Sequence, residues 1–350
     1  MQGFGKPNPT FFQRVIFSRL GAKRSQVLVG PRLGVDNAVL DIGNGKVLVT
    51  TTDPVSFIPE LGAQASAWLS VNLLASDLTT SGLSPQYGIF DFNLPPHMQP
   101  NLFADYWQSF EKECRKLGIS IVAGHTGRYS GCDYTVIGGG TLCAIGRSKR
   151  YLLSTMAEIG DDLILTKGAS IETTAVLTRA FPRTVRKALG PELFRRAQRY
   201  LKMVTTVKDA LIATSVGIHH RGVTAMHDAT EGGIIAASLE LARASRLGIE
   251  LSLDDVPLTE ETDRICKVFR IDPMSSLSEG SLLISSKPNR TDAVLRSLRS
   301  AGIAARVVGR MKTRSFGHRA TTRGRSLRLR YPETDPYWKA YWKATKKRWK

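Results

Sequence analysis

Residues 223–244 read VTAMHDATEGGIIAASLELARA, a stretch that predicts a β-strand, a glycine-rich turn and an α-helix in succession. Residues 223–227 favour a buried strand, and residues 234–244 repeat apolar side chains at helical spacing. The turn between them, residues 228–233, would present backbone N–H groups at the start of a helix, where anions bind. A tight turn without a ligand is the alternative that this stretch alone leaves open.

A second glycine-rich segment, AGHTG at residues 123–127, follows a short predicted strand and offers another loop that could cradle phosphates. Neither segment fits the pattern Gly-x-x-x-x-Gly-Lys-Ser/Thr, so the chain is not a P-loop protein. No Gly-x-Gly-x-x-Gly follows the first predicted strand, which argues against a Rossmann dinucleotide site.

Three aspartates of the first half stand at predicted strand ends or next to loops: Asp36, Asp53 and Asp77. Mg²⁺ takes carboxylate and phosphate oxygens as ligands, and carboxylates at the ends of aligned strands can meet in one crevice. Each aspartate alone could equally be a turn former or a helix cap. Asp77 fits that alternative least well, because an uncompensated charge is costly inside an apolar helix of small residues. Together they predict a site for a polyphosphate bridged by Mg²⁺.

The succession of predicted elements indicates an α/β (α+β) protein of two halves rather than a doubly wound parallel sheet. A length of 350 residues suits two domains. The expected units are a flexible arm with a short helix (1–24), a nucleotide-binding domain (25–150), a second domain (151–315) and a basic aromatic tail (316–350). The predicted strands are 27–29, 38–42, 47–52, 87–94, 119–123, 134–145, 161–166, 223–227, 282–285 and 304–308, and the predicted helices are 11–20, 63–81, 102–117, 172–180, 192–201, 207–216, 234–244 and 291–301.

The overall composition is 42% hydrophobic and 23% charged, which is typical of a soluble globular protein. No apolar run approaches the roughly 18 residues of a membrane span, and the first residues lack the pattern of a secretory signal. Four cysteines without a Cys-x-x-Cys pair argue against a zinc ribbon or a disulfide framework and suit a reducing cytosol. We therefore expect a cytoplasmic protein.

The net charge of +19 is concentrated near the C-terminus, because residues 311–350 carry thirteen basic and only two acidic side chains. Trp338, Tyr341, Trp342 and Trp349 interleave with these lysines. Such a segment could stack on the bases of a nucleic acid, bind an acidic partner or lie at a membrane surface. The alternative that the pattern favours slightly is a helix whose aromatic stripe docks on the protein itself.

Six short motifs acquire meaning from their order along the chain. They are GVDNA at 34–38, TD at 52–53, SDL at 76–78, GHT at 124–126, DATEGG at 228–233 and SEG at 278–280. The succession resembles the superfamily of aminoimidazole ribonucleotide (AIR) synthetase, the hydrogenase-maturation carbamoyl dehydratase, selenophosphate synthetase and thiamine-monophosphate kinase. The resemblance spans roughly residues 25–315 and is nearest the hydrogenase-maturation type. It implies a two-domain PurM-like fold, with N-terminal sheets that pair as a barrel in a homodimer and a C-terminal α/β sandwich.

The same resemblance implies that Mg²⁺–ATP lies in a groove and passes its γ-phosphate to an oxygen or selenium of a small substrate, which the protein assists by neutralising charge and aligning the groups. Asp36, Asp53 and Asp77 would hold Mg²⁺. The expected catalytic residues are Asp36, His125 and Lys6. The expected nucleotide-binding residues are Asp53, Asp77, Gly124, Thr126, Asp228, Thr230, Gly232 and Gly233.

The chain departs from the family pattern at several positions. Val35 stands where thiamine-monophosphate kinase has a second acid, and His125 stands where several members have a carboxylate. The chain ends at Lys350, without the C-terminal cysteine of the hydrogenase-maturation enzyme, so carbamoyl dehydration is not expected. Lys6 lies in a glycine-rich arm like that of selenophosphate synthetase, but no cysteine accompanies it. Lys6 would either cover the phosphates or be a solvated terminal lysine.

Three functions remain open at this point. The first is an ATP-dependent enzyme that phosphorylates and activates a small substrate, for example at an amide-type oxygen. The second is a phosphotransferase of the selenophosphate synthetase or thiamine-monophosphate kinase kind. The third is a nucleotide-binding scaffold without turnover, whose basic tail binds nucleic acid.

Overall fold

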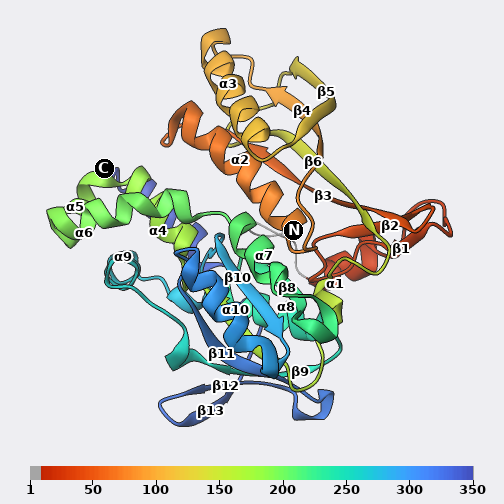
Figure 1. Ribbon diagram of the computed structural model, residues 1–350. Coiled ribbons are helices and arrows are strands. Elements are labelled where there is room, and N and C mark those ends of the chain that lie inside the picture. Colours follow the sequence, from red (N-terminus) through yellow and green to blue (C-terminus); the bar gives the residue numbers. More distant parts are fainter. Residues whose placement is uncertain (1–8, 350) are drawn as a thin grey trace.

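The chain folds into two halves, each built on its own β-sheet, as the computed structural model of residues 9–349 shows (Figure 1). The first half begins with a short turn of helix, α1 (Pro9–Phe11), which continues as a π-helix at Phe12–Ile16 where an α-helix was predicted. Lys6, one of the expected catalytic residues, lies outside the described residues.

The first sheet has six strands in the order β1-β2-β3-β6-β4-β5. Asn44 and Gly45 adopt positive φ in the turn between β2 and β3, which confirms the predicted hairpin. Helices α2 (Gly62–Thr79) and α3 (Pro100–Lys116) cover one face of this sheet (Figure 1). The strands are β1 (Val27–Val29), β2 (Ala38–Gly43), β3 (Lys46–Ser56), β4 (Tyr87–Leu94), β5 (Ser120–Arg128) and β6 (Val136–Arg147).

Alternation along the strands separates a buried face from an open one. Phe90 and Phe92 of β4 turn toward the helices and pack against Phe110 of α3. The neighbouring residues Tyr87 and Ile89 turn the other way and are 39% and 44% exposed. The open face of the first sheet is therefore apolar in part.

The second sheet has seven strands in the order β13-β12-β9-β11-β7-β10-β8, and its register brings widely separated strand ends together. These strands are β7 (Asp162–Thr166), β8 (Val223–Ala229), β9 (Gly248–Ser252), β10 (Ser281–Ser286), β11 (Ala305–Lys312), β12 (His318–Thr322) and β13 (Arg325–Arg328). Ser281 of β10 pairs with Ala229 of β8, and Leu283 pairs with Leu165 of β7. Consequently the segments after β7 and β8 and the segment before β10 emerge at one end of the sheet.

The second half contains the helices α4 (Ile171–Ala180), α5 (Pro182–Leu189), α6 (Pro191–Ala197), α7 (Val207–Ser215), α8 (Gly233–Ala244), α9 (Glu260–Phe269) and α10 (Pro288–Ser300). Of these helices, α7, α8 and α10 pack on the second sheet, whereas α4, α5, α6 and α9 pack on one another. The strands β9, β12 and β13 and the helices α5 and α9 were not predicted.

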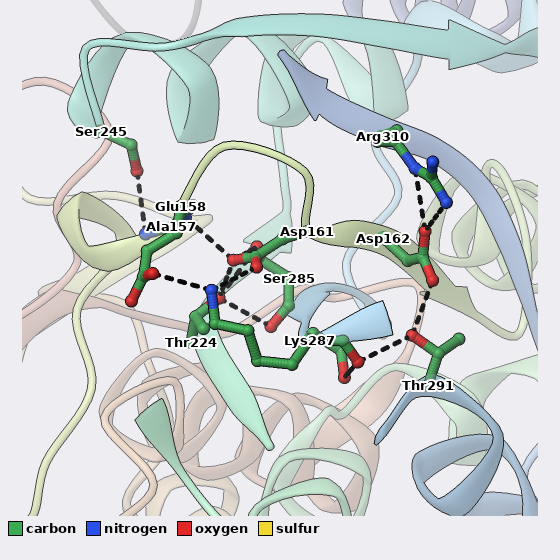
Figure 2. Close-up of polar contacts among 11 residues, drawn as sticks. Ala157, Glu158, Asp161, Asp162, Thr224, Ser245, Ser285, Lys287, Thr291 and Arg310 are labelled. Carbon is green, nitrogen blue, oxygen red and sulfur yellow. Dashed lines mark hydrogen bonds and ion pairs between the residues drawn. The ribbon is translucent and has the colours of Figure 1, made fainter. Parts of the chain in front are cut away.

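A polar cluster lies at the other end of the second sheet, where β7 and β8 begin and β10 ends (Figure 2). Lys287 Nζ lies 2.8 Å from Asp161 Oδ1 and 2.7 Å from Glu158 Oε2. Asp161 Oδ2 also accepts hydrogen bonds from the hydroxyls of Thr224 and Ser285, at 2.6 and 3.0 Å. This buried carboxylate is therefore compensated by a cation and by donors, as a purely structural buried charge requires.

The segment after residue 315, expected as a separate basic tail, belongs to the second half. Strands β12 and β13 extend the second sheet, and α11 (Pro336–Lys346) packs with buried Tyr337 and Ala344 against the cluster that contains Phe181. The docking alternative is thus the one that the structure contains. Among residues 9–349 no helix is long and apolar enough to cross a membrane.

Candidate active site

The first half contributes three aspartates to one end of the interface between the two halves. Thr51 Oγ1 on β3 donates to the backbone oxygen of Asp36 at 2.9 Å and lies 3.4 Å from Asp77 Oδ2 on α2. Asn37 Nδ2 donates to the backbone oxygen of Asp77 at 2.9 Å. Asp53 follows Thr51 by two residues on β3, so its side chain lies on the same face of the sheet.

The second half faces these aspartates with the end of β8 and the segment before β10. His227 Nδ1 is 2.8 Å from Asp36 Oδ2, a contact between residues 191 positions apart in the sequence. One potential ligand atom from each of Asp36, His227 and Asp228 lies within 4.8 Å of the others. Asp36 of the N-terminal half and Asp228 of the C-terminal half therefore lie in one cluster.

His227 is held between two carboxylates. Its Nε2 lies 3.0 Å from Glu240 Oε2 on α8, while its Nδ1 faces Asp36. Burial alone would lower the pKa of His227, but the carboxylates of Asp36 and Glu240 outweigh it and raise the pKa well above its ordinary value. Each ring nitrogen lies within hydrogen-bonding distance of a carboxylate oxygen, so His227 links Asp36 to Glu240.

Glu279 adds a buried carboxylate to the same site. Its side chain is 5% exposed, and its Oε1 has no hydrogen-bond partner among the described residues. Burial raises the pKa of Glu279 well above its ordinary value, and the charges of Asp228 and Asp77 raise it further. Unlike Asp161 in the structural cluster of Figure 2, Glu279 forms no ion pair among residues 9–349; the nearby Lys167 acts on it electrostatically, while its Nζ pairs with Asp209 and binds the Gly280 carbonyl oxygen.

Glu172, in the first turn of α4, extends the acidic region toward the C-terminal segment. Burial raises the pKa of Glu172 to about 8, with further contributions from Asp335, Glu231 and Asp53. The arrangement is a set of hard oxygen donors that repel one another. Such a set fits a divalent cation of the Mg²⁺ type, which binds carboxylates together with phosphate oxygens.

The second predicted phosphate loop lies elsewhere in the chain. Gly124, His125 and Thr126 belong to β5, an edge strand, and not to a loop. Gly124 is separated from Asp53 by β4 and β6, so the two residues are three strand spacings, roughly 14 Å, apart. His125 Nε2 is 2.7 Å from the Tyr129 hydroxyl. Within one chain these residues do not join the aspartates, because the sheet continues where the sequence suggested a break.

The turn at residues 228–233 is placed beside the site, but its amides are used internally. Gly232 N donates to Asp335 Oδ2 at 2.9 Å, and Gly233 N donates to the backbone oxygen of Thr230 at 3.1 Å. A Cβ at Gly233 would come within 2.7 Å of the Ser276 carbonyl oxygen, so glycine is needed there for close packing. The two amides therefore have partners within the protein, and nucleotide binding by this turn stays a prediction.

Sequence reasoning did not select four residues of this site: His227, Glu279, Glu172 and Glu240. Glu279 carried a signal, since it lies in the SEG motif, and His227 directly precedes Asp228. Nothing in the sequence indicated that Glu172 or Glu240 would approach the same place, because α4 and α8 read as ordinary helices.

The chain matches a family of known proteins. Residues 34–145 match the family described as AIR synthase related protein, N-terminal domain, and residues 158–318 match AIR synthase related protein, C-terminal domain. A selenide, water dikinase of Methanocaldococcus jannaschii is 27% identical to this chain over 305 residues, which is 83% of each protein.

The carbamoyl dehydratase HypE of Escherichia coli is 26% identical over 268 residues, or 75% of each protein. A crystal structure of E. coli HypE has a TM-score of 0.70 at 23% identity and covers 86% of this chain and 92% of HypE. A HypE structure in complex with ATP has a TM-score of 0.63 at 20% identity, with 94% and 93% of the chains covered. These comparisons support an ATP-using enzyme. The superfamily and the two-domain α/β fold expected from the sequence are confirmed, and the chain belongs to the AIR synthase-related family.

Proposed function

We propose that this protein binds Mg²⁺–ATP at the acidic interface between its two halves and transfers the γ-phosphoryl group to a small substrate. The observation that carries the proposal is the unpaired Oε1 of buried Glu279, which lies among the charges of Asp228, Asp77 and Asp53. Carboxylates that raise one another's pKa values lower the free energy of a bound divalent cation. A polyphosphate that shares the cation would then be held without the positive side chains of a P-loop.

The candidate cation ligands are Asp36, Asp53, Asp77, Asp228 and Glu279. Mg²⁺ would supply charge neutralisation for the phosphates, and one or two of these carboxylates suffice to hold it. Thr51 and His227 would keep two of the carboxylates in place, because each contacts a carboxylate or its backbone directly. The protein would act by aligning donor and acceptor and by neutralising charge.

The acceptor is expected to be a small molecule with an amide-type oxygen, or an acceptor of the selenide or thiamine monophosphate kind. The name of the dikinase relative supports phosphoryl transfer, and the name of the dehydratase relative supports activation of an oxygen before its loss.

Replacing Asp77 by asparagine tests the site. Titration calorimetry with Mg²⁺ and a non-hydrolysable ATP analogue should show binding to the wild-type protein and a loss of at least about tenfold in affinity for the variant, or about 1.4 kcal/mol. Asp105→Asn, on the exposed side of α3, is the matched control and should bind as the wild type does. Equal affinity of Asp77→Asn and wild type would refute the site. Binding without ADP release across a panel of small acceptors would favour the scaffold function instead.

The open face of the first sheet supports a homodimer. Tyr87 and Ile89 of β4 are 39% and 44% exposed, and Ile145 of the adjacent β6 is 37% exposed on the same face. Exposed apolar patches of this kind mark association surfaces. The family resemblance suggests that two such sheets meet as a barrel, which would bring β5 and His125 of one subunit near the other subunit.

A further inference from the structure

The C-terminal segment of residues 331–338, called here the clasp, contacts the glycine-rich turn and the helix that follows it. Asp335 Oδ2 accepts a hydrogen bond from Gly232 N at 2.9 Å. Trp338 Nε1 donates to Glu231 Oε1 at 2.6 Å. The Tyr331 hydroxyl donates to Glu240 Oε1 at 2.6 Å. Three polar groups of the clasp thus bind Glu231, Gly232 and Glu240.

The contact with Glu240 continues to the candidate cation site. Glu240 binds Tyr331 through Oε1 and His227 through Oε2, at 2.6 and 3.0 Å. His227 in turn binds Asp36 at 2.8 Å. Because both carboxylate oxygens of Glu240 and both ring nitrogens of His227 have their own partners, the position of the Asp36 carboxylate depends on that of Tyr331. The guanidinium of Arg243 lies 5.7 Å from the centre of the Tyr331 ring and supports its orientation.

The clasp is anchored independently of these polar contacts. Its helix α11 buries Tyr337, Ala340 and Ala344 in the cluster that contains Phe181 and Phe269. The ring of Trp349 packs against that of Phe269 at 5.2 Å between centroids. Loss of one polar contact should therefore leave the helix docked, and the effect on the turn can be measured in a folded protein.

We propose that the clasp is a positioning element of the active site: it fixes the turn that carries Asp228 and, through Glu240 and His227, the carboxylate of Asp36. The proposal rests on the proposed function for its consequence in nucleotide binding, but the ordering of the turn stands apart from it. The clasp touches no reacting group. Its residues act through the backbone of Gly232 and the side chains of Glu231 and Glu240.

Two conservative variants and one matched control test the proposal. Trp338→Phe removes the indole N–H and keeps an aromatic ring, and Tyr331→Phe removes only a hydroxyl. Trp349→Phe makes a comparable change at the end of the chain, where the ring has an aromatic contact and no hydrogen bond recorded among the described residues. Hydrogen–deuterium exchange of residues 228–236 without nucleotide measures the order of the turn, and calorimetry with Mg²⁺ and a non-hydrolysable ATP analogue measures affinity.

Exchange in the turn should become about tenfold faster in Trp338→Phe and Tyr331→Phe, since one hydrogen bond contributes about that factor to a local opening equilibrium. The affinity for the nucleotide should fall by a similar factor, about tenfold, while Trp349→Phe changes neither quantity. Unchanged exchange in both variants would overturn the proposal, and so would faster exchange with equal or tighter binding. If the wild-type protein binds no nucleotide, the proposed function fails, and the exchange comparison still decides whether the clasp orders the turn.

Discussion

Replacing Glu279 by glutamine should affect stability and ligand binding in opposite directions. Glu279 is buried and lies among like charges, so its ionised form costs free energy in the protein without a cation. Two unit charges about 5 Å apart repel by about 3 kcal/mol at an effective dielectric constant of about 20. Removing one of them should raise the stability of the metal-free protein by about 1–3 kcal/mol, or the Tm by about 1–4 °C for a chain of this length.

The same substitution should weaken Mg²⁺–ATP. At a ligand concentration of about 100 times Kd, bound ligand adds about 2.7 kcal/mol to the stability of the wild-type protein. A tenfold loss of affinity removes about 1.4 kcal/mol, so the ligand-induced rise in Tm should be about halved in the variant. Thermal unfolding at pH 8, with and without Mg²⁺ and a non-hydrolysable ATP analogue, measures both effects.

Glu261 provides a matched control because it is a second buried glutamate, 2% exposed, and is paired with Arg196. Glu261→Gln should lower the Tm, since it loses an ion pair, and should keep the full ligand-induced shift. A lower Tm for Glu279→Gln, or an unchanged ligand-induced shift, would contradict the acidic site.

Three further predictions follow from the same structure. Lys287→Met should destabilise the protein by about 3 kcal/mol in urea denaturation, because it leaves Asp161 buried without its cation. Nucleotide affinity should not change. A loss of stability below about 1 kcal/mol would show that the hydroxyl donors alone compensate the Asp161 carboxylate. Ile89→Glu should convert a dimer to a monomer in light scattering, whereas Glu111→Gln on α3 should not; a monomeric wild-type protein would refute this association surface. The Tm of the Mg²⁺-free protein should fall as the pH rises from about 5 to about 8. Glu172 has a pKa of about 8 in the folded protein and 4.5 in its unperturbed state, so folding favours the protonated carboxyl group. The stability that this protonation contributes is lost as the pH rises through the folded-state pKa. Glu172→Gln should flatten this dependence, and an equal slope in the variant would assign it to other groups.

The sequence by itself determined the local elements whose signals are strong. Residues 62–79 form the small-residue helix that was predicted, β4 has the predicted bounds, and the hairpin at residues 43–45 has the expected positive φ values. The short strands β12 and β13 were missed because their polar sequences, HRATT and RSLR, become strands only through pairing, β12 with β9 and β13 with β12. Strand pairing of this kind is a tertiary effect, since β-propensity depends on neighbouring strands.

For the candidate site, the sequence supplied the residue types and the tertiary structure supplied their distances. Asp36, Asp53, Asp77 and Asp228 could be selected because the motifs that contain them follow one another in the order of a known superfamily. The pairing of His227 with Asp36 across 191 residues could not be predicted, because it depends on how the two sheets face each other. The break expected at Gly124 did not occur, since pairing with β4 keeps these residues extended. The acceptors of the Gly232 amide and of the Trp338 indole N–H were likewise decided only by folding, which brings a C-terminal segment back over a turn a hundred residues earlier.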